Sequence, residues 1–159
     1  MPSPQDLFLV KAATAAAAAG HIFPEYAACE AALESAWGGS QLATQANNLF
    51  GQKQSHPPLP GSTTLNLPTH EVVNGVSVPT EAQWVVFPDW SSCFKARMAL
   101  LQRLASAYPD YQTALNATTG EQFVTAVSHT WSTDPQRGAK VLAIYNAHSS
   151  AFTTTPAQS

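Results

Sequence analysis

An alanine-rich stretch that leads into Gly38 and Gly39 is the feature that most constrains how this chain can fold. Residues 27–34 contain good helix formers and no β-branched residue, which predicts a helix that continues up to the glycine pair. Glu34 then lies in the last helical turn. Glu30 lies four residues earlier, on the same helical face.

The position of Glu34 suggests acid chemistry. The negative end of the helix dipole and the like charge of Glu30 both disfavour the ionised form of Glu34. A carboxyl group that stays protonated near neutral pH can donate a proton to the leaving oxygen of a glycoside. The alternative is that Glu30 and Glu34 form an ordinary solvated stripe on a surface helix.

Two motifs with a fixed spacing extend this prediction. Residues 31–38 read Ala-Ala-Leu-Glu-Ser-Ala-Trp-Gly, and residues 48–53 read Asn-Leu-Phe-Gly-Gln-Lys. Together they resemble glycoside hydrolase family 73, the bacterial β-N-acetylglucosaminidases that include flagellar peptidoglycan hydrolases and autolysins. The family has glycine where this chain has Ala36 and isoleucine where it has Gln52. The resemblance implies that Glu34 is the general acid.

The same resemblance suggests residues that hold the glycan. Trp37, Asn48, Phe50 and Trp131 are candidates, although Trp37 and Phe50 are at least as well suited to core positions that shape the turn. The family places a tyrosine two residues before a Thr-Asp-Pro motif, where this chain has Trp131. His129 offers a polar group nearby. The family also has a lysine further along that Lys140 matches.

Residues 63–87 predict a small antiparallel lobe. They are rich in Thr and Val, and Asn-Gly at 74–75 predicts a hairpin turn between strands 69–73 and 76–78, with a further strand at 83–87. Pro68 and Pro79 flank the hairpin, which suits edge positions. Glu71 precedes the turn as the second, catalytically implicated glutamate does in the resembling family. Without the resemblance, a solvent-facing strand residue would be the preferred interpretation of Glu71.

The remaining segments predict helices and loops. Helices are expected from Ser3-Pro4 to Gly20, from Pro24 onward, from Asp89 to about Ala105, over 109–115 and 119–127, and from Asp134-Pro135 to about Asn146. The proline-rich residues 55–61 predict a loop. The Ser/Thr-rich residues 149–159 predict a flexible tail.

Composition excludes several classes of function. Only 11% of the residues are charged and the net charge is -3, so nucleic acid is not an expected partner. Cys29 and Cys93 have no metal-type spacing, and two buried free thiols are favoured over a disulfide. The five histidines form no ligand cluster, and His70-Glu71 lacks the second histidine of a zinc-protease helix. We expect neither a metal nor a cofactor.

The apolar run at residues 7–19 predicts neither a signal peptide nor membrane insertion. Its positive charge, Lys11, lies inside the run instead of ahead of it, and the run is too short to span a bilayer. We therefore expect a protein that is made in the cytoplasm and reaches the cell wall after lysis or through a secretion apparatus. A delivered effector would also have an inhibitor or immunity protein as a partner.

These observations predict an α+β, lysozyme-like fold in one domain, residues 1–148, with a mainly helical body and a small antiparallel β-lobe (about 63–87) flanking an active-site groove. The expected activity of this monomer is hydrolysis of the β-1,4 bond after N-acetylglucosamine in peptidoglycan glycan strands. Glu34 would protonate the leaving oxygen. Glu71 would activate water or stabilise positive charge, or the substrate acetamido group would supply the nucleophile. The alternatives are a muramidase or lytic transglycosylase that cleaves after N-acetylmuramic acid, and a non-catalytic glycan-binding module.

Overall fold

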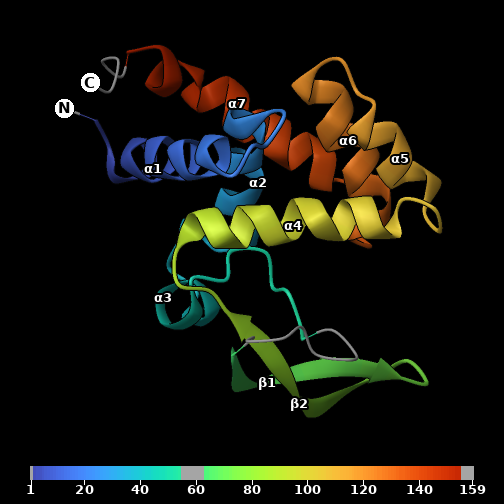
Figure 1. The fold of residues 1–159 in the computed structure, drawn as a ribbon. Helices are drawn as coiled ribbons and strands as arrows, with labels where there is room; N and C mark the ends of the chain where they lie inside the picture. The colour runs from blue at the N-terminus through green and yellow to red at the C-terminus, as the bar shows by residue number, and fades with distance from the viewer. Residues whose placement is uncertain (1, 55–62, 155–159) are drawn as a thin grey trace.

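The computed structural model of the chain describes residues 2–54 and 63–154. These residues form a body of seven helices, and a two-stranded ribbon lies below this body (Figure 1). The elements in chain order are α1 (Pro4–Ala18), α2 (Pro24–Glu34), α3 (Gln41–Ala46), β1 (Thr63–Val73), β2 (Val76–Val86), α4 (Trp90–Leu104), α5 (Pro109–Leu115), α6 (Gly120–Trp131) and α7 (Arg137–Thr154). The predicted α+β class, with a mainly helical body and a small antiparallel lobe, is confirmed.

Helix α2 lies at the centre of the helical body. It packs against α1, α6 and α7, and every residue from Ala27 to Ala32 is buried. The small alanine side chains allow neighbouring helices to approach closely, because the distance between helix axes depends on the side chains at the contact. Larger apolar residues complete the core around it, among them Leu9, Leu49, Phe94, Leu101, Phe123, Val124, Val127 and Val141.

Local sequence signals set most helix starts. Ser3 caps α1 by accepting a hydrogen bond from the Asp6 backbone N–H, and Asp89 caps α4 by accepting one from the Ser92 N–H. Pro24 stands at the start of α2, as predicted. Helix α3 was not predicted. It is a single short helix capped by Ser40, and it carries the chain from the end of α2 toward the ribbon.

The β-lobe is a long two-stranded ribbon whose turn was predicted correctly. β1 and β2 pair antiparallel from Thr63↔Val86 to Val73↔Val76, around a turn in which Asn74 and Gly75 have positive φ. The predicted strands 76–78 and 83–87 are parts of the same strand, β2. Pro68 and Pro79 therefore lie inside the strands and do not flank them. A two-stranded ribbon permits this because each strand has a free edge where no N–H is needed.

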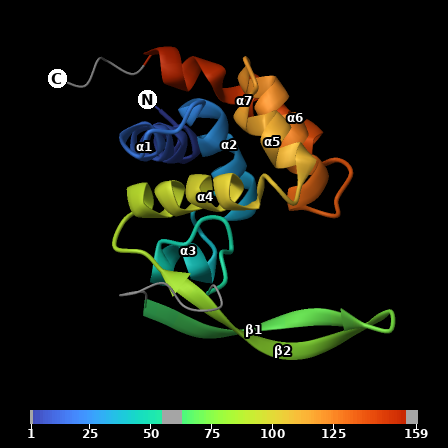
Figure 2. The same ribbon diagram turned by 45° about the vertical axis from the view of Figure 1, so that its right-hand side comes forward.

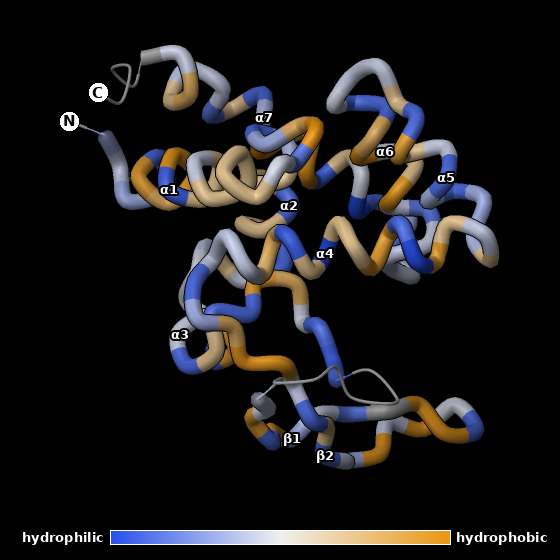
Figure 3. Tube along the Cα trace, viewed as in Figure 1, coloured by the Kyte–Doolittle hydropathy of each residue, from blue (hydrophilic) through white to orange (hydrophobic). Residues whose placement is uncertain are grey.

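The ribbon projects from the helical body below α4 and α3 (Figures 1 and 2). Its far end carries exposed apolar residues, Val72, Val73, Val76 and Val78 (Figure 3). The end nearer the body is less exposed, with Leu65, Leu67 and Trp84 partly buried. A backbone bridge between Lys53 and Trp84 joins this end to the segment that follows α3.

The C-terminal helices are longer than predicted. α6 continues past Val127 to Trp131, and α7 continues past Asn146 to Thr154. The prediction of a flexible tail from residue 149 is wrong for residues 149–154. Ala151 is buried there, and Phe152 stacks on Tyr145, which itself stacks on Tyr26 of α2. The predicted loop at 55–61 and the rest of the predicted tail lie outside the described residues.

Within the described part of the chain, no helix combines the length and the apolar character that crossing a membrane requires.

Candidate active site

The turn after α2 places Glu34 at the exposed end of an otherwise buried helix. The backbone N–H of Trp37 donates to the carbonyl of Ala32, and the Ser35 N–H donates to that of Ala31. This is a Schellman-type helix end, with Ala36 in the left-handed position that glycine usually occupies. The Ser35 hydroxyl donates to the Ala31 carbonyl at 2.6 Å and accepts from the Gly38 N–H at 2.9 Å. The helix therefore ends at Glu34, before the glycine pair is reached.

Gly38 is needed where the chain turns back against α1. Its φ is +80°, and a Cβ atom there would lie 3.0 Å from the Phe8 ring. Trp37 packs edge-on against Phe8 and His148, at ring-centroid distances of 6.1 and 5.3 Å. Trp37 thus anchors the turn to α1 and α7. It is not among the residues that line the cleft beside Glu34.

That cleft lies between the helical body and the ribbon. It has a volume of about 260 Å³ and is lined by Glu34, Ser40, Gln41, Leu42, Asn48, Phe50, Gly51, Leu67, Pro68 and Trp84. The lining combines one carboxyl group with aromatic side chains and polar groups. This is the composition expected of a site that binds a sugar, because an aromatic face can stack on a sugar ring while polar groups fix its hydroxyls.

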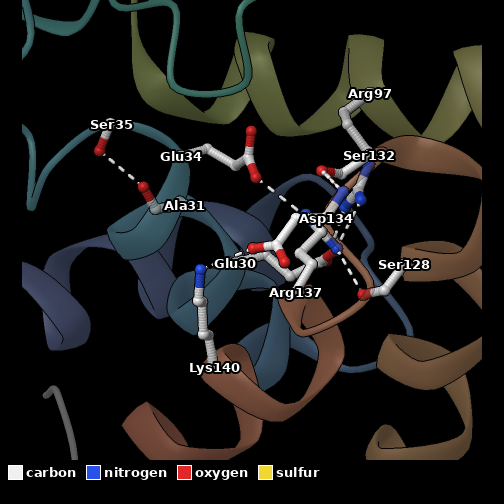
Figure 4. Close-up of polar contacts among 10 residues, drawn as sticks. All are labelled: Glu30, Ala31, Glu34, Ser35, Arg97, Ser128, Ser132, Asp134, Arg137 and Lys140. Carbon is white, nitrogen blue, oxygen red and sulfur yellow. Dashed lines mark hydrogen bonds and ion pairs between the residues drawn. The ribbon is translucent and has the colours of Figure 1, made fainter.

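Glu30 does not form a solvated stripe with Glu34. Its side chain is fully buried, and it accepts two hydrogen bonds from Arg97, at 2.7 and 2.8 Å, and one from Arg137 at 2.9 Å (Figure 4). Burial opposes ionisation of Glu30, but the charges and hydrogen bonds of Arg97 and Arg137 outweigh it and hold its pKa well below the ordinary value.

Glu34 is paired as well. Its Oε2 atom accepts a hydrogen bond from Arg137 Nε at 3.1 Å, and its side chain is 24% exposed. Two glutamate and two arginine side chains therefore meet in one cluster. The expectation that an uncompensated Glu30 charge acts on Glu34 is wrong, because two arginines neutralise Glu30.

Arg97 connects this cluster to the aromatic residues. Its guanidinium carbon lies 4.6 Å from the ring centroids of both Phe50 and Trp131, and the two rings meet edge-on at 6.2 Å. Phe50 is buried and also lines the cleft, whereas Trp131 is half-buried at the end of α6. The structure thus brings Phe50 and Trp131 together around Arg97, and of these two rings Phe50 lines the cleft beside Glu34.

Asn48 lines the cleft but uses its amide for structure. The Nδ2 group donates to the backbone carbonyls of Gln52 and Val85, both at 2.9 Å, and Oδ1 accepts from the Gln52 N–H at 3.0 Å. Asn48 therefore ties the segment after α3 to strand β2, and so fixes one wall of the cleft.

The structure does not bring His129 to this cleft. Residues 129 and 131 are about 200° apart around α6, since each helical residue turns the chain by about 100°. His129 is exposed, with Nδ1 3.9 Å from the Asp110 carboxylate. It lines a separate hollow of about 920 Å³ between α6 and α7.

Glu71 lies in β1, where its backbone pairs with that of Val78. The strand assignment of His70-Glu71 is confirmed, and with it the prediction that these residues are not part of a zinc-protease helix. Leu67 and Pro68 of the same strand line the cleft.

Sequence reasoning missed three residues of this region: Arg97, Arg137 and Trp84. A sequence signal exists for Arg97. Arg97 lies three residues after Phe94 and four before Leu101, on the apolar face of its helix, and Glu30 lies within a run of alanines. Opposite charges on two faces predicted to be buried indicate a buried ion pair, because an unpaired charge is too costly to bury. Trp84 has no comparable signal beyond its place in the strand.

Cys29 and Cys93 are both buried and unpaired, which confirms the prediction of free thiols. Burial raises the pKa of Cys29 to about 12 and that of Cys93 to about 11, so both stay protonated. Among the described residues, no group of three or more His, Cys, Asp or Glu side chains is arranged to hold a metal ion.

The exo-glucosaminidase LytG of Bacillus subtilis (strain 168) is 29% identical over 126 residues, which are 78% of this chain and 43% of LytG. The chain thus spans less than half the length of this curated relative.

Solved structures show the same fold. The catalytic domain of the autolysin Auto from Listeria monocytogenes matches with a TM-score of 0.80 and 22% identity, over 96% of this chain and 88% of that chain. A C-terminally truncated glycoside hydrolase domain of Salmonella typhimurium FlgJ matches with a TM-score of 0.70 and 24% identity, over 92% of this chain and 98% of that chain. The lysozyme-like architecture predicted from sequence is confirmed.

The family model described as mannosyl-glycoprotein endo-β-N-acetylglucosaminidase matches residues 10–150, nearly the whole described chain. The resemblance that the sequence motifs suggested is therefore confirmed, and the chain belongs to the glucosaminidase family of glycoside hydrolases.

Proposed function

We propose that this protein hydrolyses the β-1,4 bond after N-acetylglucosamine in the glycan strands of peptidoglycan, with Glu34 as the general acid. The observation that carries the proposal is the position of Glu34, at the end of α2 and in the wall of a cleft lined by Phe50 and Trp84. Family membership and the likeness to LytG, Auto and FlgJ support a cell-wall glycan as the substrate.

In the proposed reaction, Glu34 donates a proton to the glycosidic oxygen as the bond to the sugar carbon breaks. Glu71 is the second carboxyl group, which activates water or stabilises positive charge on the sugar. Its place in the ribbon, in the same strand as Leu67 and Pro68 of the cleft wall, supports this role. Phe50 and Trp84 form the aromatic side of the cleft, and Trp131 packs against Phe50. Asn48 and Trp37 hold the surrounding segments in shape.

The test is Glu34→Gln, assayed by the loss of turbidity of a cell-wall suspension. Glutamine keeps an oxygen that accepts from Arg137 but has no proton to transfer, so we expect turnover to fall by about 100-fold to 10,000-fold. The fold should persist, with an unchanged circular dichroism spectrum. Wild-type turnover in this variant would contradict the role of Glu34, and a wild-type protein without activity would favour a non-catalytic glycan-binding module.

The bond cleaved is tested separately. Reduction of the digested wall followed by mass analysis identifies the new reducing end. N-acetylglucosamine at that end supports the proposal, whereas N-acetylmuramic acid or its anhydro form would identify a muramidase or a lytic transglycosylase.

A further inference from the structure

The buried charge cluster extends from Glu30 to the cleft. Glu30 alone already binds both arginines, yet Arg137 also reaches Glu34, which is partly exposed in the cleft. Three nitrogen positions of Arg137 have different surroundings. Nε donates to Glu34 at 3.1 Å, and Nη1 donates to Glu30 at 2.9 Å and to the Ser128 hydroxyl at 2.8 Å, while the buried Nη2 has no hydrogen-bond partner among the described residues.

Buried hydrogen-bond partners therefore hold the guanidinium of Arg137 in place. Its side chain is 2% exposed, Glu30 is fully buried, and Ser128 on α6 is buried as well. A planar guanidinium that is held at Nη1 has little freedom left at Nε. The direction of the Nε–H bond, and with it the position of Glu34 Oε2, is set by residues that solvent does not reach.

We propose that Arg137 is a positioning residue of the reaction: it binds Glu34 Oε2 and so reserves Oε1 for the proton that is transferred to the glycosidic oxygen. This inference rests on the proposed role of Glu34. A proton on Oε2 would face the Nε–H of Arg137, and two donors cannot share one hydrogen bond. Oε1 accepts no hydrogen bond from any residue that the structure describes, so it is the oxygen left for the substrate.

The proton balance of the step follows from this geometry. The O–H bond at Oε1 breaks, a new O–H bond forms on the leaving sugar oxygen, and the electron pair of the broken glycosidic bond stays on that oxygen. Glu34 becomes a carboxylate, whose Oε2 already accepts a charge-assisted hydrogen bond from Arg137. Because Arg137 does not line the cleft, it acts on the chemical step and not on substrate binding.

The inference predicts a loss of kcat without a change in KM. With soluble glycan strands as substrate, Arg137→Met should lower kcat by about 100-fold, the order expected when a catalytic group is misplaced by about 1 Å, with KM within twofold of wild type. Arg137→Lys keeps the charge but not the two fixed donors, and should also lower kcat. Arg103→Met, which removes an exposed arginine from the last turn of α4, is the matched control and should leave both constants unchanged.

Ser128→Ala extends the test to a protein that keeps both arginines and both glutamates of the cluster. It removes one hydrogen bond that holds Arg137, and we expect kcat to fall by about threefold to tenfold at constant KM. This variant decides the question if the Arg137 variants do not fold. The inference is overturned if Arg137→Met or Ser128→Ala has the wild-type kcat per folded molecule. It is also overturned if Arg137→Lys has the full wild-type kcat. If Glu34→Gln remains active, the proposed function fails instead.

Discussion

At the scale of single residues, Ala36 has a backbone conformation that disfavours a side chain. Its φ of +50° lies in the left-handed region, which costs a residue with a Cβ atom about 1–2 kcal/mol, whereas glycine loses about 0.5–1 kcal/mol more than alanine in chain entropy on folding. We therefore expect Ala36→Gly to raise the free energy of unfolding by up to about 1.5 kcal/mol, measured by denaturant titration.

The matched control is Ala17→Gly, at an exposed position inside α1. Glycine there has no strain to relieve, and should lower the free energy of unfolding by about 0.5–1 kcal/mol. Opposite signs in the two variants support the account of the turn. Destabilisation of both would contradict it.

The residue scale is also where sequence reasoning was least complete. The position of Glu34 at the end of α2 followed from helix propensity and the glycine pair. The burial and pairing of Glu30 could not be predicted in the same way, because its partners Arg97 and Arg137 lie 67 and 107 residues away in the chain. A local rule for like charges four residues apart takes no account of such contacts.

At the scale of the elements, the ribbon depends on its turn. Gly75 has a φ of +78°, and no atom lies within 4 Å of an added Cβ, so Gly75→Ala introduces backbone strain without a clash. We expect this variant to loosen the pairing of β1 and β2 and to reduce turnover, because β1 contributes Leu67 and Pro68 to the cleft wall and carries Glu71, which we propose as the second carboxyl group.

Gly20→Ala is the control for that variant. Gly20 has a φ of +83° and equally open surroundings, but it lies at the end of α1, away from the cleft. The strain in the two variants is similar, about 1–2 kcal/mol. Kinetic constants per folded molecule should change in Gly75→Ala only. Equal kinetics in both would mean that the ribbon geometry does not affect the reaction.

The elements with clear start signals were predicted well. Ser3, Pro24, Asp89 and Thr119 each mark the beginning of a helix, and Asn-Gly marks the hairpin turn. The ends of α6 and α7 were placed too early because their last turns are stabilised by packing. Phe152 against Tyr145 is the clearest case, and a polar Ser/Thr composition gives no sign of it.

At the scale of the whole molecule, the buried polar residues govern the response to acid. His21 is buried beside Phe123, where burial and then the positive charge of Arg97 lower its pKa to about 4, against the opposing effect of Glu30. Its Nδ1 atom accepts a hydrogen bond from the Phe23 backbone N–H, while its buried Nε2 has no hydrogen-bond partner among the described residues. The folded protein therefore holds His21 in its neutral form.

This arrangement predicts a loss of stability in mild acid. The unfolded chain takes up a proton at His21 near pH 6.5, and the folded chain does so only near pH 4, so acidification through this window favours unfolding. The difference between the two pKa values of His21 corresponds to about 3 kcal/mol of unfolding free energy, which is lost progressively as the pH falls from about 6.5 to 4. His21→Asn keeps a side-chain acceptor for the Phe23 N–H but does not titrate. The free energy of unfolding of this variant should therefore change less with pH in this window. Denaturant titrations at a series of pH values measure both slopes, with His70→Asn, at an exposed position of the ribbon, as the control.

Below about pH 4.5 a second loss of stability should appear in wild type and in both variants. The unfolded chain then protonates Glu30, while Arg97 and Arg137 keep it ionised in the folded state. An equal slope between pH 6.5 and 4 in wild type and His21→Asn would show that the acid sensitivity of the fold arises elsewhere.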